Sequence, residues 1–282
     1  MYQINLARTI REKVGKAKFR KMSKWWIPIL EKIIHQDELN EFLATDGKDK
    51  VGVPFADAAL DKFLNIKLRI IGELPSNGRF TFVSNHPLGG IDGLTLCKII
   101  GKEYPGVKVF LNSFLAELPG LEPFAIPVNV AGKSDKGIVD KVDDVFSSNN
   151  QIVMFPAQIC SRKQHGEIKD LPWKKGFVQK SIEFNRDIVP IYFHGFNSKR
   201  FYRFANFAKF LSKVFKKPAL IKLPMIFLPH EMIKNRGQQF TIVIGEPIKA
   251  THLRYLLDSH RGNYHKLAAD IQEDVYRLRG KM

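Results

Sequence analysis

The stretch FVSNHPLGGIDG, residues 82–93, joins an apolar run to the start of a helical pattern. The apolar half is typical of a buried strand. His86 follows it directly, and Asp92 lies six positions further on, after two adjacent glycines. Ligands of α/β proteins bind at the carboxyl ends of strands. This turn is therefore the first place in the chain to look for chemistry.

Strand-like and helix-like runs alternate outward from this turn. The strand-like runs are Ile66–Ile71, Phe80–Ser84, Val107–Leu111, Ala125–Val130, Gln151–Phe155, Ile188–Phe193 and Phe240–Ile244. The helical runs are Gly93–Ile100, Ser134–Phe146 with Ser134 as N-cap, Trp173–Phe184, Phe201–Lys217 and a polar surface helix over Arg261–Arg279. This alternation predicts an α/β fold, a largely parallel mixed sheet with helices on both faces, preceded by an N-terminal amphipathic helical pair.

Composition limits the possible partners. The chain has 282 residues, 44% of them hydrophobic, which is enough for a sizeable core. Its formal net charge of +17 favours anionic partners such as nucleic acid, acidic lipid or an acidic carrier. The two cysteines, Cys97 and Cys160, form no disulfide framework, which indicates a reducing compartment.

Two helices are predicted at the N-terminus. Apolar residues recur there at every fourth position: Leu6, Ile10 and Val14. Lysines and arginines fill the other faces, so an amphipathic helix is expected over residues 1–24. Pro28 suits the first turn of a second helix, which should run to about Leu43.

Trp25 and Trp26 lie between these two helices. Basic residues and Trp beside a short apolar face are typical of helices that lie on anionic membranes, although a solvated helix pair has the same pattern. We expect residues 1–50 to form a membrane-association segment and residues 51–282 the α/β domain. No run approaches the roughly 20 apolar residues of a spanning helix. A peripheral or monotopic protein at the cytoplasmic face of the cell membrane is expected.

His86 and Asp92 have the residue types of a catalytic dyad. An unperturbed histidine changes charge near neutral pH, and a carboxylate on its far nitrogen fixes the tautomer and stabilises the imidazolium. Gly89, Gly90 and Gly93 permit the tight path that such a dyad needs. The alternative is structural, with His86 capping the following helix and Asp92 capping a turn.

The stretch resembles the catalytic motif of the glycerolipid (lysophospholipid, PlsC-like) acyltransferases, which is a His, four residues and an Asp. Further blocks appear in the order of that family: LNSFLAELPGLEPFAIPVNV at 111–130, FPAQICSRK at 155–163, IVPIYFHG at 188–195 and FTIVIGEPI at 240–248. The resemblance covers about residues 60–250. With IKDLPWKKGF after the third block, it is closest to the hemolysin-like branch that acylates lyso-aminoacyl lipids, such as lyso-ornithine or lyso-glycine lipids.

Several positions depart from the family pattern. Five residues, not four, separate His86 from Asp92. The third block usually reads FPEGTRS, but Ala157 replaces its acid and Cys160 replaces the Arg that grips an acceptor phosphate. Asn129 stands about where the second block commonly has another phosphate-binding Arg. Arg162 and Lys163 are close enough in sequence to compensate in part.

The resemblance implies O-acylation of a lipid hydroxyl by an acyl thioester, carried by acyl carrier protein or coenzyme A, without a metal or another cofactor. It implies that His86, oriented by Asp92, is the general base. The oxyanion would be held by backbone N–H groups of Gly89 and Gly90 or of the loop after Pro156. The residues expected to bind substrate are Asn85, Gly89, Gly90, Gly93, Phe155, Pro156, Ser161, Arg162 and Lys163.

Other functions fit parts of the sequence. A 1-acylglycerol-3-phosphate acyltransferase is the nearest alternative. A serine hydrolase through Ser84 or Ser134 lacks the G-x-S-x-G elbow, while Cys160 is an alternative thiol nucleophile. A different class, a nucleic-acid binder, would use the basic and aromatic stretch 202–217. There Phe204, Phe207, Ala208 and Leu211 follow helical spacing, which favours a core-facing or membrane-facing stripe, and no nucleic-acid partner is expected.

Overall fold

A seven-stranded sheet organises the protein, whose computed structural model describes residues 2–14, 26–116, 118–128 and 136–282. The strands in spatial order are β1 (Lys67–Ile71), β9 (Gln239–Ile244), β8 (Asp187–His194), β2 (Phe80–Ser84), β5 (Gln151–Met154), β3 (Val107–Asn112) and β4 (Ala125–Val128). Each of the seven predicted strands is present. The last two positions of the run predicted to end at Val130 lie outside the described residues.

The strand directions make the sheet mixed but largely parallel. β8, β2, β5, β3 and β4 run parallel to one another. β9 is antiparallel to β8, and β1 is parallel to β9. Five carboxyl ends therefore lie at one edge of the sheet, and the turn after β2 is among them.

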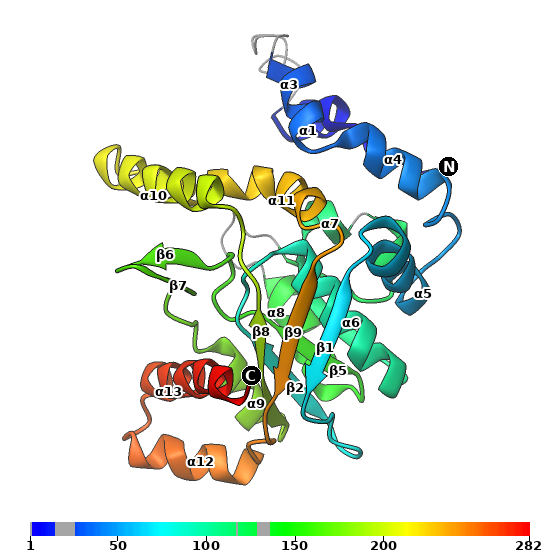
Figure 1. Cartoon of the computed structure of the whole chain (residues 1–282). Coiled ribbons are helices and arrows are strands. Elements are labelled where there is room, and N and C mark those ends of the chain that lie inside the picture. Colours follow the sequence, from blue (N-terminus) through cyan, green and yellow to red (C-terminus); the bar gives the residue numbers. More distant parts are fainter. Residues whose placement is uncertain (1, 15–25, 117, 129–135) are drawn as a thin grey trace.

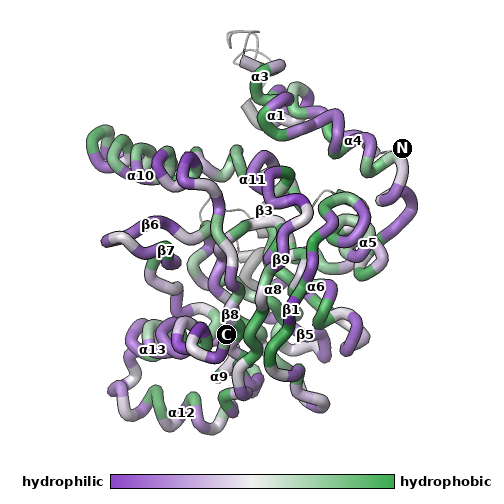
Figure 2. Tube along the Cα trace, in the orientation of Figure 1, coloured by the Kyte–Doolittle hydropathy of each residue, from purple (hydrophilic) through white to green (hydrophobic). Residues whose placement is uncertain are grey.

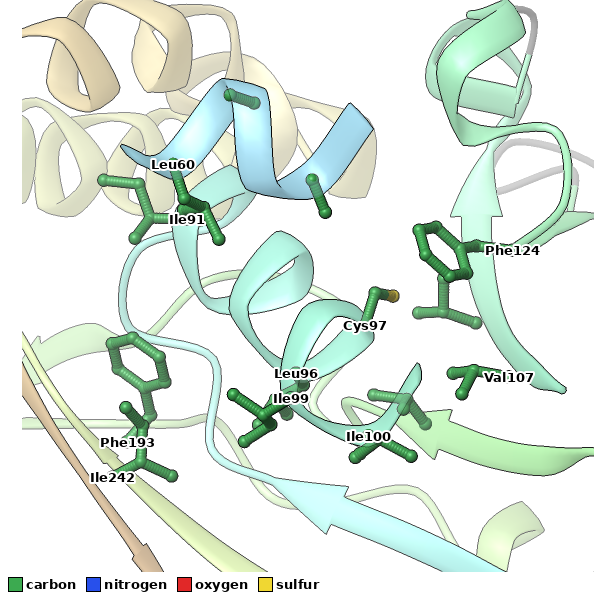
Figure 3. Close-up of a cluster of buried hydrophobic side chains, with 14 of the residues drawn as sticks. Leu60, Ile91, Leu96, Cys97, Ile99, Ile100, Val107, Phe124, Phe193 and Ile242 are labelled. Atoms are coloured by element: carbon green, nitrogen blue, oxygen red, sulfur yellow. The ribbon is translucent and has the colours of Figure 1, made fainter. Parts of the chain in front are cut away.

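Helices cover both faces, as predicted, because alternate strand residues enter two separate cores. Phe82 of β2 packs against one face with α5 (Val53–Asp57), a π-helical turn η1 (Ala58–Phe63) and α6 (Gly90–Glu103). Figure 3 shows side chains of α6 in this core, between Val107 and Ile242. Val83, the next residue, packs against α9 (Gly176–Glu183), α12 (Ala250–Ser259) and α13 (Tyr264–Arg277) on the opposite face.

Several helix boundaries differ from the predictions. α6 begins three residues before Gly93 and ends three residues after Ile100. α9 begins three residues after Trp173, whose side chain is buried in the preceding loop. α8 (Lys136–Ser147) corresponds to the helix predicted over Ser134–Phe146, but its expected N-cap, Ser134, lies outside the described residues. α13 is more than a polar surface helix, because four of its apolar side chains are buried: Leu267, Ala268, Ile271 and Val275.

The N-terminal helices are α1 (Leu6–Val14), α3 (Trp26–Ile33) and α4 (Gln36–Ala44). They lie beyond the carboxyl edge of the sheet (Figure 1). The prediction of one helix from Pro28 to Leu43 is wrong, because His35 takes a left-handed backbone conformation, φ 53°, between α3 and α4. Its ring bonds to Glu38 and to His230. Residues 15–25, which include Trp25, lie outside the described part.

A layer of helices crosses the carboxyl edge of the sheet (Figure 1). It consists of α10 (Lys199–Val214), a 3-10 helix η3 (Pro218–Phe227) and α11 (Leu228–Lys234). The helix predicted over Phe201–Lys217 is thus present, starting at its cap Ser198. Shorter elements are α7 (Ser113–Ala116), η2 (Pro119–Leu121), η4 (Leu278–Lys281) and the hairpin of β6 (Arg162–Gln164) and β7 (Glu167–Lys169).

Apolar residues concentrate in the sheet, while the outer helices alternate between apolar and polar positions (Figure 2). Among the described residues, no helix has both the length and the apolar character needed to cross a bilayer.

Candidate active site

The turn after β2 is organised by one buried carboxylate, that of Asp92. Its Oδ2 atom accepts hydrogen bonds from the N–H groups of Leu88 at 2.9 Å and Gly89 at 3.2 Å. Asp92 is the third residue of α6, where an acidic side chain can reach back to cap the helix start. Gly89 has φ 83°, a conformation that strains residues with a side chain. The extra residue between His86 and Asp92 is accommodated in this turn.

The same Oδ2 atom lies 3.1 Å from Nδ1 of His86. An ionised carboxylate can only accept, so Nδ1 carries the hydrogen and Nε2 is left as the basic nitrogen. The structural and chemical interpretations of this stretch are therefore compatible, since Asp92 caps the turn and also bonds the ring. The imidazole stacks on Phe155, with ring centroids 4.2 Å apart, and its side chain keeps 14% of its surface exposed.

Two opposing effects set the pKa of His86. Burial disfavours the charged ring and lowers the pKa, but attraction to Asp92 and to the nearby Cys160 outweighs burial. The pKa of His86 is consequently raised well above the ordinary histidine value.

The glycines of the turn bring other groups close to His86. A methyl group added to Gly89 would lie 2.8 Å from Leu228 and 3.1 Å from the sulfur of Cys160. A methyl group on Gly90 would lie 3.3 Å from the sulfur of Met232. α11 thus forms a roof over the turn, and larger residues at either glycine would push that roof away.

A second buried carboxylate, Asp170, supports the backbone of His86. Its two oxygens each lie 3.2 Å from the N–H of His86. It also accepts from the hydroxyl of Ser161 at 2.6 Å and from the indole of Trp173 at 3.0 Å. Burial raises the pKa of Asp170, although the hydrogen bonds from Ser161 and Trp173 oppose the rise.

Sequence reasoning missed Asp170. The available signal was its place in IKDLPWKKGF, three residues before a Trp that is also part of that motif. Asp170 connects the third block to the first, because it accepts from both Ser161 and His86. A direct hydrogen bond from the N–H of Ser161 to the carbonyl of His86, at 2.8 Å, joins the same two blocks.

Some of the other predicted substrate-binding residues lie in this turn, and others have structural partners. Gly93 lies next to Phe155, whose ring covers His86. The side-chain amide of Asn85 is engaged with the backbone of Phe193 in β8, at 2.9 Å and 2.7 Å. Pro156 is buried, and its carbonyl accepts from the N–H of Lys174.

Arg162 does not occupy the place vacated by the family Arg. Its guanidinium is buried, donates to the carbonyls of Cys160 and Ile221, and lies over the ring of Phe201. The side chain of Lys163 is exposed on the β6–β7 hairpin. Arg162 is therefore engaged with the backbone rather than open to an acceptor phosphate. Asn129 lies outside the described residues.

This combination of fold and strand-end turn belongs to a known class of enzyme. The model of the acyltransferase family matches residues 8–265, so the chain belongs to that family and is an acyltransferase.

Two relatives at more than 40% identity bear names that agree with this class. A lyso-glycine lipid O-acyltransferase of Phocaeicola vulgatus is 47% identical over 251 residues, 88% of this chain and 87% of that protein. One of Bacteroides thetaiotaomicron is 43% identical, over 88% of this chain and 89% of that protein. The crystal structure of the 1-acyl-sn-glycerophosphate acyltransferase PlsC from Thermotoga maritima covers 94% of this chain and 83% of its own, with 14% identity and a TM-score of 0.48.

We expect Asp170→Asn to lower the acyl-transfer rate by at least about tenfold, because the N–H of His86 loses one of the two acceptor oxygens that fix its backbone. An amide has one acceptor oxygen where the carboxylate has two, so the variant should also lose about 1–3 kcal/mol of unfolding free energy. Steady-state rates and denaturant unfolding measure the two effects. Asp274→Asn, an exposed carboxylate paired with Arg277, is the matched control. An Asp170→Asn rate equal to that of the control would contradict the positioning role.

Proposed function

We propose that the protein transfers a fatty acyl group from an acyl thioester of acyl carrier protein or coenzyme A to the hydroxyl of a lyso-lipid. The acceptor we propose is a lyso-aminoacyl lipid of the glycine or ornithine type. The observation that carries the proposal is the hydrogen bond between His86 and Asp92 at a strand end, in a chain whose relatives are named for this reaction.

The proton transfers of the chemical step need no group beyond the two substrates and this dyad. Nε2 of His86 takes the proton of the acceptor hydroxyl as its oxygen attacks the thioester carbonyl carbon. The carbon–sulfur bond breaks, and the imidazolium returns the proton to the leaving thiolate. Asp92 holds the ring in the required tautomer and stabilises its positive charge between these events.

The oxyanion formed during attack requires backbone donors, and the turn limits the choice. Gly89 is one of the donors suggested by the sequence, but its N–H already donates to Asp92. The N–H of Gly90, in the first turn of α6, has no partner in the described part of the chain. We assign the oxyanion to Gly90, where the positive end of the helix dipole also favours negative charge.

A second route for acyl transfer would pass through Cys160, because its thiol interacts with His86. An S-acyl intermediate on Cys160 would use the same base. The thiol is fully buried against Phe201 and Tyr202, which favours a packing role and direct transfer to the lipid.

The third block supports the proposed choice of acceptor. A phosphate pocket normally uses the planar fork of Arg, but here Cys160 stands at that position among apolar side chains. Arg162 is already engaged with backbone carbonyls. Both features support an aminoacyl acceptor over lysophosphatidic acid.

We further propose that the enzyme works at an anionic membrane surface. The N-terminal helices carry exposed apolar side chains, with Trp26 at 62% and Ile29 at 49% exposure, in a strongly basic segment. Such helices bind anionic headgroups. A peripheral location at the cytoplasmic face of the cell membrane follows from this proposal.

His86→Ala should lower acyl transfer by about 10²–10⁴-fold without unfolding the protein, because it removes the general base. As the pH is lowered, kcat/KM of the wild type should begin to fall at a pH above about 6.5. The reason is that the pKa of His86 is raised and the base must be neutral to accept a proton. Asp92→Asn should move this acid limb to lower pH, because the carboxylate that raises the pKa is gone, and should also reduce the maximal rate.

The measurements are pH–rate profiles and thermal unfolding, with His252→Ala on α12 as the matched control. Near-normal turnover by folded His86→Ala would rule out the mechanism. An Asp92→Asn profile unchanged in both rate and pH would show that another group orients the ring.

Cys160→Ala should keep activity within about tenfold of the wild type if transfer is direct, because it removes packing and one interaction that raises the pKa of His86, but no reacting group. Cys97→Ala, at the other buried cysteine, is the control. Intact-mass spectrometry of the wild type incubated with acyl donor alone should show no acylated protein. An acyl adduct on Cys160, together with a loss as large as that of His86→Ala, would replace direct transfer by the two-step route.

A lyso-aminoacyl lipid should be a better acceptor than lysophosphatidic acid by at least roughly tenfold in kcat/KM, equivalent to about 1.4 kcal/mol. The measurement is a parallel assay of both acceptors with one acyl donor. A preference for lysophosphatidic acid that disappears in Arg162→Ala would instead assign the enzyme to phospholipid synthesis.

A further inference from the structure

The helix layer over the carboxyl edge of the sheet comes from an unusually basic part of the chain. Between Asp187 and Glu231 there is no acidic residue, and eight Lys or Arg residues lie there: Lys199, Arg200, Arg203, Lys209, Lys213, Lys216, Lys217 and Lys222. Within the described residues, no ion pair joins Lys209, Lys213, Lys216 or Lys217 to a carboxylate. The segment therefore presents a net positive field to whatever lies opposite it.

α10 has two apolar faces, and other described residues cover only one of them. Its inner face buries four side chains: Phe201, Tyr202, Ala205 and Ala208. Its outer face exposes Phe207 at 54%, Phe210 at 60% and Val214 at 55%, spaced three and four residues apart along one stripe. The stripe expected from the sequence, which combined Phe207 with Ala208, is thus divided between the two faces.

The exposed stripe continues into the following turn and 3-10 helix. Phe215 is 60% exposed and Leu223 is 47% exposed. η3 packs back on α10, with the rings of Phe204 and Phe227 5.1 Å apart. We call residues 199–227 the α10–η3 hairpin.

We propose that the outer face of the α10–η3 hairpin lies in the headgroup region of an anionic bilayer, as a second membrane contact besides the N-terminal helices. This inference rests on the proposed lipid-acylating function. Exposed aromatic side chains lie beside Lys209, Lys213, Lys216 and Lys217, which form no ion pair among the described residues, and this combination matches the apolar and anionic layers of such a surface. Large apolar side chains gathered on one face of a soluble protein mark an interaction site.

This contact would place the proposed active site directly under the membrane. The chain passes from η3 into α11, whose Leu228 and Met232 form the roof over Gly89 and Gly90. A lyso-lipid leaving the bilayer at the hairpin would therefore meet this roof before reaching His86. The hairpin is also fixed to the third block, since Arg162 bonds to Ile221 and lies over Phe201.

The test is sedimentation of the full chain with vesicles of phosphatidylcholine containing about one-third phosphatidylglycerol. Phe207→Ser/Phe210→Ser should lower the partition coefficient about tenfold, equivalent to about 1.4 kcal/mol. The matched control is Tyr255→Ser, because Tyr255 is 68% exposed on α12, at the end of the molecule far from the hairpin (Figure 1). Tyr255→Ser should bind like the wild type. Lys209→Glu/Lys213→Glu should reduce binding and flatten its dependence on salt.

Catalysis is measured separately, with lyso-lipid below its micellar concentration, so that vesicle binding and chemistry are read independently. The double Phe variant should retain this activity, and that result also shows that it is folded. If it binds vesicles as well as Tyr255→Ser does, the proposal is wrong even where the activity remains. Unchanged vesicle binding with weakened binding of acyl carrier protein would assign this face to the acidic carrier. If the wild type acylates none of the lyso-lipids tested, the proposed function is wrong, but the vesicle-binding result still stands.

Discussion

The local structure of the proposed site depends on one buried atom, Oδ2 of Asp92. It accepts from the backbone of Leu88 and Gly89 and also faces Nδ1 of His86. A carboxylate buried without such donors would be costly, so its burial and its hydrogen bonds are inseparable. The same interactions that cap the first turn of α6 therefore orient the ring. Helix capping and the proposed base chemistry therefore both require an acidic residue at position 92.

A second carboxylate extends this arrangement across the sheet. Asp170 joins the backbone of His86 to Ser161 and Trp173, and Asn85 joins the end of β2 to β8. These contacts connect residues from distant parts of the chain at one edge of the sheet. His86 is consequently held through its backbone from one side and through its ring from the other. Such double support is what a preorganised base requires.

The sequence predicted the strands well because they are short and rich in β-branched and aromatic residues, and because central strands such as β2 and β8 are buried on both faces. It also predicted the His86–Asp92 contact, since both residues flank one glycine turn. It did not predict Asp170, because hydrogen bonds between residues 84 positions apart leave no periodic signal. The break at His35 was missed for a similar reason, since its partner His230 lies 195 positions away.

The departures in the third block change what that block does. The cysteine at the usual Arg position packs against Phe201 and Tyr202 of α10, and Arg162, two residues later, bonds to η3. The block in which the usual pattern has an Arg therefore supports the α10–η3 hairpin in this chain. Under the proposed function, the absence of an Arg at position 160 and the attachment of the hairpin involve the same short segment, Cys160–Arg162. The proposed acceptor choice and the proposed membrane contact would then depend on each other, because one segment contributes to both.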